Sequence, residues 1–346
     1  MKRILALFAA SAVLLSCPGR AQETSSAGPY KVLKTVKAGG DGSFDYVYAD
    51  VAGRRLYVPR LGATGRITVF DLDSLEPVGE IAGVSAHGAA VDAKSHHGFG
   101  SSNPVAMWDS TTLAKIKDIQ VQGRPDGIME DQFNDRVYVF SHISPNATVI
   151  DAASGSVVGT ADLGGSPEQA VADGKGHLYI DLEDKGSIAV LDAKTLKVTA
   201  TYDLQGKGAG CSGLAMDVEH RILFAACHNP QTMVILNADD GKILDTLPIG
   251  NGVDGAVFNQ KTMEAFSSQG DGTLTIVKEK SPSSFAVEQN LPTMTLAKTL
   301  TLDSKTNRII LIAAEFGPAP AAAAPGGRPG RGQMIPGSFS ILLVGK

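Results

Sequence analysis

The chain has 346 residues, of which 43% are hydrophobic and 19% charged, so it can bury a sizeable core and is not disordered as a whole. Its formal net charge of −5 disfavours nonspecific binding to nucleic acid, and no apolar run reaches the roughly 18 residues of a membrane-spanning helix, so we expect neither a nucleic-acid partner nor a transmembrane helix. The 39 glycines and 17 prolines favour many turns between short strands.

Residues 1–21 have the pattern of a secretory signal peptide. A basic start precedes an apolar stretch over residues 4–15, and the small residues Gly19 and Ala21 fit cleavage after position 21. The alternative is a lipobox ending at Cys17, through which the protein would be anchored as a lipoprotein. Both alternatives place the mature protein in the periplasm or outside the cell, with residues 22–28 as a short linker before the folded domain.

A repeat of about 42 residues runs through residues 29–346. Within each unit, short β-branched runs such as 188–191 alternate with clusters of Gly, Asp and Asn, which predicts four strands per unit. Each unit carries an Asp or Asn, here called the repeat marker, at the end of its first strand: Asp50, Asp92, Asp131, Asp173, Asp217, Asn259 and Asp303. Seven such units predict an all-β fold, a seven-bladed β-propeller that forms a single domain.

The two ends of the chain are expected to share the last blade. The seventh unit supplies three strands, near residues 299–302, 308–313 and 338–344, and then the chain ends. Residues 30–36 have the pattern of a fourth strand, so we expect them to pair with residues 338–344, which would close the ring and protect its edge. Residues 317–337 form a Pro/Ala/Gly-rich loop insertion, either a passive linker or a cover over the channel.

Several stretches repeat one pattern of strand entry and strand end: 123–127, 136–139, 171–180, 227–229, 271–276 and 314–318. This pattern resembles the YVTN-type propeller repeat, and residues 29–346 as a whole resemble the bacterial YncE-like family. The resemblance implies a WD40-like propeller of seven blades outside the cytoplasm, with no catalytic motif to carry over. Three blades depart from the usual Pro-x-Gly entry to the first strand, because 86–88, 211–213 and 253–255 lack the proline.

One side chain per blade is expected at the rim of the central channel, because the first strand of each blade lines that channel. Counting five residues back from each marker gives these rim residues: Asp45, His87, Asp126, Glu168, Ser212, Asp254 and Lys298. Four of them are acidic, which predicts an acidic funnel that binds a small molecule, a peptide or a protein partner. The alternative is a ring filled by water, in which Lys298 balances the acids.

The acidic rim residues are also candidate metal ligands. Carboxylate oxygens suit a hard divalent cation, and the candidates are Asp45, Asp126, Glu168 and Asp254. No other cofactor is expected.

Loops after the second strands provide a second tier on the same face, called the top face: Arg60, Asn103, His142, Glu183, His228 and Glu315. Of these, His142 and His228 could act as acids or bases near neutral pH. Four further histidines fall in turns on the opposite, lower face and are expected to be plain surface residues: His96, His97, His177 and His220.

Cys211 and Cys227 are expected to form a disulfide. They are the only cysteines left once the signal peptide is removed, and the compartment is oxidising. The turn between them centres on Glu219, so the two residues lie roughly opposite each other on an antiparallel hairpin. Two free buried thiols are the alternative.

The sequence contains none of the usual motifs of serine hydrolases, zinc proteases or nucleotide-binding loops. We therefore favour a monomeric, noncatalytic binding protein over an enzyme. The alternative is a metal-assisted hydrolase or lyase of the lactonase-propeller type, in which His87 or His228 moves a proton beside the cation. A scaffold without any small ligand is the third interpretation.

Overall fold

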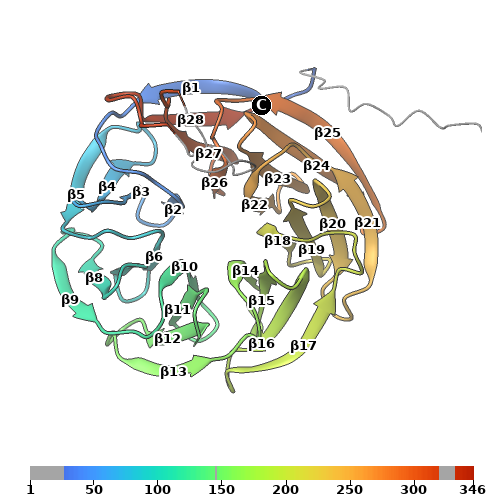
Figure 1. Ribbon diagram of the computed structural model, residues 1–346, viewed down its shortest axis with the longest axis horizontal. Helices are drawn as coiled ribbons and strands as arrows, with labels where there is room; N and C mark the ends of the chain where they lie inside the picture. The colour runs from blue at the N-terminus through green and yellow to red at the C-terminus, as the bar shows by residue number, and fades with distance from the viewer. Residues whose placement is uncertain (1–26, 145, 319–331) are drawn as a thin grey trace, which may run out of the picture.

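The structure is a computed structural model that describes residues 27–144, 146–318 and 332–346. These residues form seven four-stranded antiparallel sheets arranged in a ring (Figure 1), which confirms the predicted all-β, seven-bladed propeller. No helix in this part of the chain is long and apolar enough to cross a membrane. The predicted signal peptide, Cys17 and most of the Pro/Ala/Gly-rich insertion lie outside the described residues.

In every blade the first strand is innermost and the fourth lies on the outer rim (Figure 1). Blades 1 to 3 consist of β2 (Tyr48–Asp50), β3 (Arg55–Arg60), β4 (Arg66–Asp71) and β5 (Pro77–Ala82); β6 (Ala89–Asp92), β7 (His97–Gly100), β8 (Val105–Asp109) and β9 (Lys115–Ile119); and β10 (Pro125–Asp131), β11 (Arg136–Ser141), β12 (Ala147–Asp151) and β13 (Val157–Ala161). Blades 4 and 5 consist of β14 (Pro167–Ala172), β15 (His177–Leu182), β16 (Ser187–Asp192) and β17 (Lys197–Asp203); and β18 (Cys211–Asp217), β19 (Ile222–Cys227), β20 (Thr232–Asn237) and β21 (Ile243–Pro248). Blades 6 and 7 consist of β22 (Val253–Asn259), β23 (Glu264–Gln269), β24 (Thr273–Ser281) and β25 (Ser284–Pro292); and β26 (Thr299–Asp303), β27 (Arg308–Ala313), β28 (Ser340–Gly345) and β1 (Lys31–Lys37).

The N-terminal strand closes the ring as predicted. β1 pairs antiparallel with β28, with Lys31 opposite Gly345 and Lys37 opposite Ser340, and the two strands lie side by side in Figure 1. Tyr30, just before β1, is buried and packs edge-on against Phe266 of blade 6, with ring centroids 5.3 Å apart. The closing strand is therefore held by its own blade and by its neighbour.

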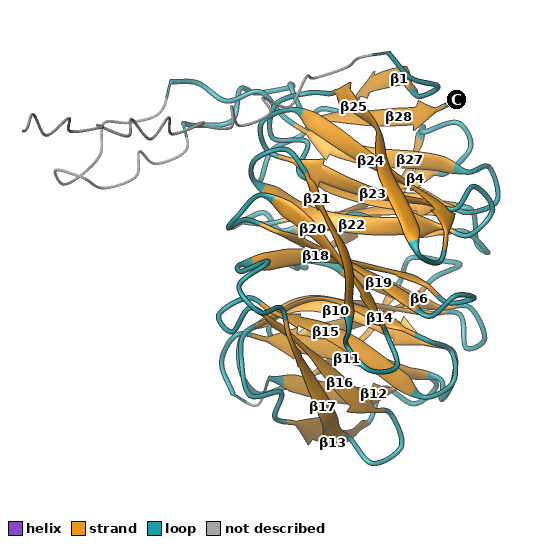
Figure 2. Cartoon of the chain, turned by 90° about the vertical axis from the view of Figure 1, so that its right-hand side faces the viewer, coloured by secondary structure: helices purple, strands orange, loops and turns teal. Residues whose placement is uncertain are grey.

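The core lies between neighbouring blades, which stack face to face around the axis (Figure 2). One cluster, for example, joins Tyr179 and Ile188 of blade 4 to Leu214 and Leu223 of blade 5. Inner strands are covered on both faces, so β19 is buried throughout, whereas the outer strand β17 alternates between exposed and half-buried residues. This explains why the inner strands read as continuous apolar runs in the sequence.

The repeat markers shape the turns of the lower face. The Asp50 carboxylate, for example, accepts a hydrogen bond from the Gly53 amide at 2.8 Å. The residue that ends this turn, just before the second strand, has a left-handed backbone in several blades, with φ of 54° at Arg54, 60° at Arg221 and 52° at Met263. The repeat thus places a buried Asp or Asn and one left-handed residue at each of these turns.

Candidate functional site

The rim residues of blades 1 to 4 form a chain of alternating acids and imidazoles. His87 Nδ1 lies 2.9 Å from an Asp45 oxygen and 3.1 Å from an Asp126 oxygen. His142, from the loop after β11, continues the chain, with Nε2 3.3 Å from the other Asp126 oxygen and 3.0 Å from Glu168 Oε1. Asp126 therefore faces one histidine with each of its two oxygens.

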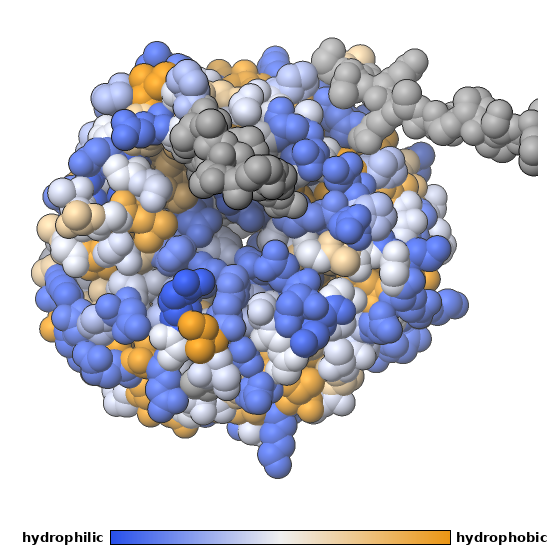
Figure 3. Space-filling view, viewed as in Figure 1, coloured by the Kyte–Doolittle hydropathy of each residue, from blue (hydrophilic) through white to orange (hydrophobic). Residues whose placement is uncertain are grey.

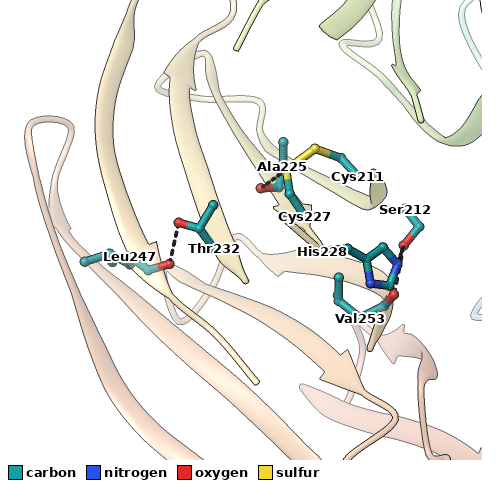
Figure 4. The surroundings of a disulfide bond; sticks show 8 residues. All are labelled: Cys211, Ser212, Ala225, Cys227, His228, Thr232, Leu247 and Val253. Carbon is teal, nitrogen blue, oxygen red and sulfur yellow. Dashed lines mark hydrogen bonds between the residues drawn. A yellow bond between two sulfur atoms is a disulfide. The ribbon is translucent and has the colours of Figure 1, made fainter. Parts of the chain in front are cut away.

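Lysine 298 extends this chain in the other direction around the ring. Its amino group forms a close ion pair with Asp254 and lies 3.9 Å from Asp45 Oδ1. Ser212 stands apart from the chain, because it is buried and its hydroxyl donates to the Val253 carbonyl at 2.8 Å (Figure 4). The same hydroxyl lies 3.2 Å from His228 Nε2. Six of the seven predicted rim residues thus belong to one charge network, which we call the top-face ring, together with His142.

The ring is less acidic than the sequence predicts. The neighbouring carboxylate of Glu168 raises the pKa of His142 to about 9, and the hydrogen bond to Asp45 raises the pKa of His87. His142 therefore carries its proton near neutral pH. Burial in turn raises the pKa of Asp126 and of Glu168. Each acid of the ring therefore has a basic neighbour. The rim positions alone do not indicate this balance, because His142 belongs to the loop after β11.

Two large polar side chains form the floor of the funnel. Tyr46 follows Asp45 in the chain, and its hydroxyl lies 3.3 Å from Glu168 Oε2. Gln169 follows Glu168 and crosses to blades 5 and 6, where it accepts from the Leu214 amide at 3.1 Å and donates to the Ala256 carbonyl at 2.8 Å. Tyr46 and Gln169 both line a cavity of about 260 Å³, most of whose other lining residues come from the first strands.

The position after each rim residue is a sequence signal that could have revealed this floor. Four blades have glycine there: Gly88, Gly127, Gly213 and Gly255. A Cβ at Gly88 would lie 3.5 Å from the Tyr46 ring, and one at Gly213 would lie 2.8 Å from the Gly255 backbone. A Cβ at Gly88 would only touch the Tyr46 ring, whereas glycine at position 213 is what allows the inner strands to approach closely.

A further acid lies behind the ring. Asp181 of β15 is fully buried, and among the described residues neither of its carboxylate oxygens has a hydrogen-bond partner. Burial, followed by the charge of Glu168, raises its pKa well above the usual value. Asp181 is therefore a buried acid near Glu168 that no sequence pattern indicated.

The second tier is only partly as predicted. Asn103, Glu183 and Glu315 are exposed, and His228 is half-buried beside Ser212. Arg60 is not a free top-face group, because it is 2% exposed and its guanidinium stacks 3.8 Å from the centre of the Phe339 ring. Burial, together with the charge of Arg66, lowers the pKa of Arg60 to about 10.

The lower-face histidines also differ from the prediction. His96 is exposed as expected. His97 contacts the Ala152 carbonyl at 2.9 Å, and His177 and His220 each lie within 3.1 Å of a buried repeat marker. These three side chains are therefore engaged in contacts with the fold rather than being plain surface residues.

Two sets of candidate metal ligands lie side by side in the top-face ring. One comprises Asp45, His87 and Asp126, and the other comprises Asp126, His142 and Glu168, each with its ligand atoms within 4.8 Å of one another. Asp254, a predicted ligand, belongs to neither set because Lys298 pairs with it. The geometry thus replaces one predicted carboxylate by two imidazoles, a donor set that suits transition metals better than Ca²⁺.

The surface around the central opening is hydrophilic on the face seen in Figure 3. Beside it, the structure joins Cys211 and Cys227 in the predicted disulfide, at opposite positions of the β18–β19 hairpin (Figure 4). The bridge holds the chain next to Ser212 and His228 at the edge of the funnel.

No protein-family model matches the chain, and no curated protein does either. Solved structures do match. The WD40 repeats of RRP9 align with a TM-score of 0.72 at 10% identity, covering 92% of this chain and 99% of that one. U3-55K aligns at 0.71 and 10% identity, covering 91% and 98%. A chain of a mitotic checkpoint complex aligns at 0.69 and 14% identity, covering 90% and 95%.

At these identities the likeness shows the fold alone. The protein has a WD40-like fold, a β-propeller with seven blades.

Proposed function

We propose that the protein is a noncatalytic binding propeller of the YncE-like type, which works outside the cytoplasm and recognises a peptide or another zwitterionic molecule at the top-face ring. The observation that carries this proposal is the alternation of charge around the ring. Asp254, Lys298 and Asp45 follow one another on one side, and Asp126, His142 and Glu168 on the other. In a ligand that carries both an amine and a carboxylate, the amine can pair with the acids of such a ring and the carboxylate with its basic side chains.

The balance of charge also argues against a simple cation as ligand. Each acid of the ring already faces a basic group, so a cation would have to displace Lys298 or the protons of His87 and His142. The floor of Tyr46 and Gln169 adds neutral hydrogen-bonding groups below the charges. One structural neighbour is a chain of a mitotic checkpoint complex, which is compatible with a protein segment as partner.

Binding of synthetic tetrapeptide pools tests this proposal. We expect pools with free termini to raise the melting temperature of the protein, and pools with acetylated and amidated termini to have no effect. The double variant Asp126→Asn, Glu168→Gln removes two ring charges and should lose the response. Asp135→Asn on the lower face is the control and should keep it. An equal response of the double variant, or none in the wild type, would place recognition elsewhere.

The proposed location rests on the signal-like segment 1–21 and is supported by the Cys211–Cys227 disulfide, since structural disulfides persist in oxidising compartments. The intact mass of protein purified from the periplasm tests it. Processing after Ala21 would leave Gln22 as the first residue, whereas an acylated Cys17 would show the lipoprotein alternative.

A second candidate is the metal-assisted hydrolase or lyase of the lactonase type. The specific observation in its favour is that Asp126 belongs to both ligand sets, so that two neighbouring cations could share it. Hydrolysis of simple lactones by protein loaded with Zn²⁺, Mn²⁺ or Ca²⁺ tests this candidate. Activity that is lost with chelator and in Asp126→Asn would support it, and the absence of turnover with every metal would eliminate it.

A further inference from the structure

Two of the buried repeat markers of the lower face pair with an arginine from the next blade. Arg221 of blade 5 donates to Asp173 of blade 4 at 2.8 Å. Arg54 of blade 1 donates to both oxygens of Asp303 of blade 7, each at 2.8 Å. Both arginines occupy the left-handed position just before the second strand. A guanidinium across the seam between two blades thus neutralises a carboxylate that is 1% exposed in Asp173 and 3% in Asp303.

The seam between blades 5 and 6 lacks this arginine. The equivalent left-handed position of blade 6 is Met263, which offers no charge to the marker Asp217. The side chain of Asp217 is nonetheless completely buried. Its carboxylate must therefore be neutralised in another way, because an uncompensated buried charge costs several kcal/mol.

Two other side chains converge on Asp217. His220, from the turn after β18, places Nδ1 2.7 Å from Asp217 Oδ2. Glu279 of β24 reaches across the seam and places Oε1 2.8 Å from the same nitrogen. A ring nitrogen carries at most one proton, so it can donate a hydrogen bond to only one of the two carboxylates at a time. Two acids thus share one imidazole nitrogen, whereas the seams at Asp173 and Asp303 each have a guanidinium.

The second carboxylate is itself buried without a proper partner. Glu279 is 3% exposed, and neither of its oxygens makes a hydrogen bond of ordinary geometry with a described residue. It is directed at His220 and Asp217 from a different blade, so the cluster does not arise from local turn geometry. A buried, unsatisfied carboxylate aimed at a second carboxylate and an imidazole is the environment that a cation stabilises.

We propose that Asp217, His220 and Glu279 bind a divalent transition-metal ion of the Zn²⁺ type at the seam between blades 5 and 6. One nitrogen and two carboxylate oxygens form a donor set that Zn²⁺ accepts, and the imidazole favours it over Ca²⁺ or Mg²⁺. The three ligand atoms lie within 4.8 Å of one another. Tetrahedral Zn²⁺ needs donors about 3.4 Å apart, which small rotations of the side chains reach.

Such an ion would cross-link the two blades. His220 and Asp217 belong to the β18–β19 hairpin, and Glu279 belongs to β24, whose backbone amide at the same residue bonds to the Met263 carbonyl at 3.0 Å. The His220 side chain is 34% exposed, which leaves a path for the ion and a water ligand. Because the ion binds the folded chain, it stabilises the propeller by mass action. This site is independent of the top-face ring.

Zn²⁺ titration of chelator-treated protein by calorimetry tests the proposal. We expect Glu279→Gln, which keeps the shape of the side chain, to weaken Zn²⁺ binding at this site more than about a hundredfold, since even residues behind metal ligands contribute about 10- to 100-fold. His220→Asn should have a similar effect. Zn²⁺ should raise the melting temperature of the wild type and leave that of both variants unchanged, while Ca²⁺ should have little effect on any of them.

Two control variants locate the ion. His177→Asn alters the equivalent seam between blades 4 and 5, where Arg221 already neutralises Asp173, and should bind Zn²⁺ like the wild type. Asp126→Asn breaks both ligand sets of the top-face ring and should also retain the lower-face site. The proposal is overturned if the wild type binds no Zn²⁺, if Glu279→Gln and His220→Asn bind it unchanged, or if binding is lost only in Asp126→Asn.

Discussion

The seams on the two sides of blade 5 are built from the same repeat positions but are neutralised differently. Between blades 4 and 5, Asp173 is held by His177 and by Arg221 from the next blade. Between blades 5 and 6, the marker Asp217 faces His220 and a second acid, Glu279. The repeat thus determines where a buried carboxylate lies. Single residues outside the repeat pattern determine whether a side chain or a bound cation neutralises it.

The largest effect is expected when the first seam is made like the second. Arg221→Met removes the guanidinium that contacts Asp173 and leaves that buried carboxylate without its strongest partner. We expect a loss of about 3–5 kcal/mol of unfolding free energy, the usual cost of breaking a buried ion pair. Urea unfolding followed by fluorescence or circular dichroism measures it.

The matched control for Arg221→Met is Lys94→Met. Lys94 pairs with Asp135 on the same face, but its side chain is 74% exposed, so its removal should have little effect on stability. If the two variants lose the same unfolding free energy, burial of the marker does not determine how much its ion pair stabilises the protein.

The second prediction tests whether the seams depend on the hairpin that they share. β18 and β19 carry Asp217 at the lower end and the Cys211–Cys227 bridge at the top end. Replacing both cysteines by alanine should lower the unfolding free energy by about 3 kcal/mol. The bridge joins residues 16 positions apart, and closing a loop of roughly 15 residues in the unfolded chain stabilises the fold by about that amount. Zn²⁺ affinity below the unfolding transition should stay the same. A parallel loss of affinity would show that the lower-face cluster is not preformed by the sheet.

The sequence predicts the architecture well because it is encoded in spacing. The markers from Asp50 to Asp303 recur at one period. The seventh unit has only three strands of its own, and the closing strand at 31–37 supplies its fourth. The rim residues follow from the same period, since each first strand enters the channel in the same way. The disulfide follows from the symmetry of a single hairpin.

Contacts between different blades are not predictable in this way. His142 reaches Asp126 and Glu168 from a loop, and Glu279 reaches His220 from another sheet. The spacing of the repeat does not predict which loop side chain contacts which residue of the neighbouring blade. The same holds for Arg60. Its guanidinium packs against the Phe339 ring, and this contact with another blade is not encoded in the repeat.

The third prediction concerns the pH dependence of the seam between blades 7 and 1. Burial acts to raise the pKa of Asp303, but hydrogen bonds from Arg54 and Thr306 outweigh it and bring the pKa down to about 2. The pKa of an unfolded aspartate is about 3.9. This carboxylate therefore stabilises the fold above about pH 4, and the contribution is lost as the pH falls through about 2.

Arg54→Met should flatten that acid dependence. We expect the wild type to lose about 2 kcal/mol more stability than the variant between about pH 4 and about pH 2. Urea midpoints across this range provide the measurement. An identical acid slope in both proteins would mean that Arg54 does not set the ionisation of Asp303.

The smallest effect, and the sharpest test of the comparison, is expected from Met263→Arg. This substitution installs in blade 6 the residue that the equivalent position holds in blades 1 and 5, and the left-handed backbone there already accommodates arginine at Arg54 and Arg221. The new guanidinium should reach Asp217 and Glu279 and raise the unfolding free energy in chelator by about 1 kcal/mol. It should also abolish the stabilisation by Zn²⁺, because the two carboxylates would already be neutralised. Met263→Leu keeps the position apolar and should preserve the Zn²⁺ response. If Met263→Arg instead destabilises the chelated protein and still responds to Zn²⁺, position 263 does not face the acids, and the two seams differ by more than the source of their positive charge.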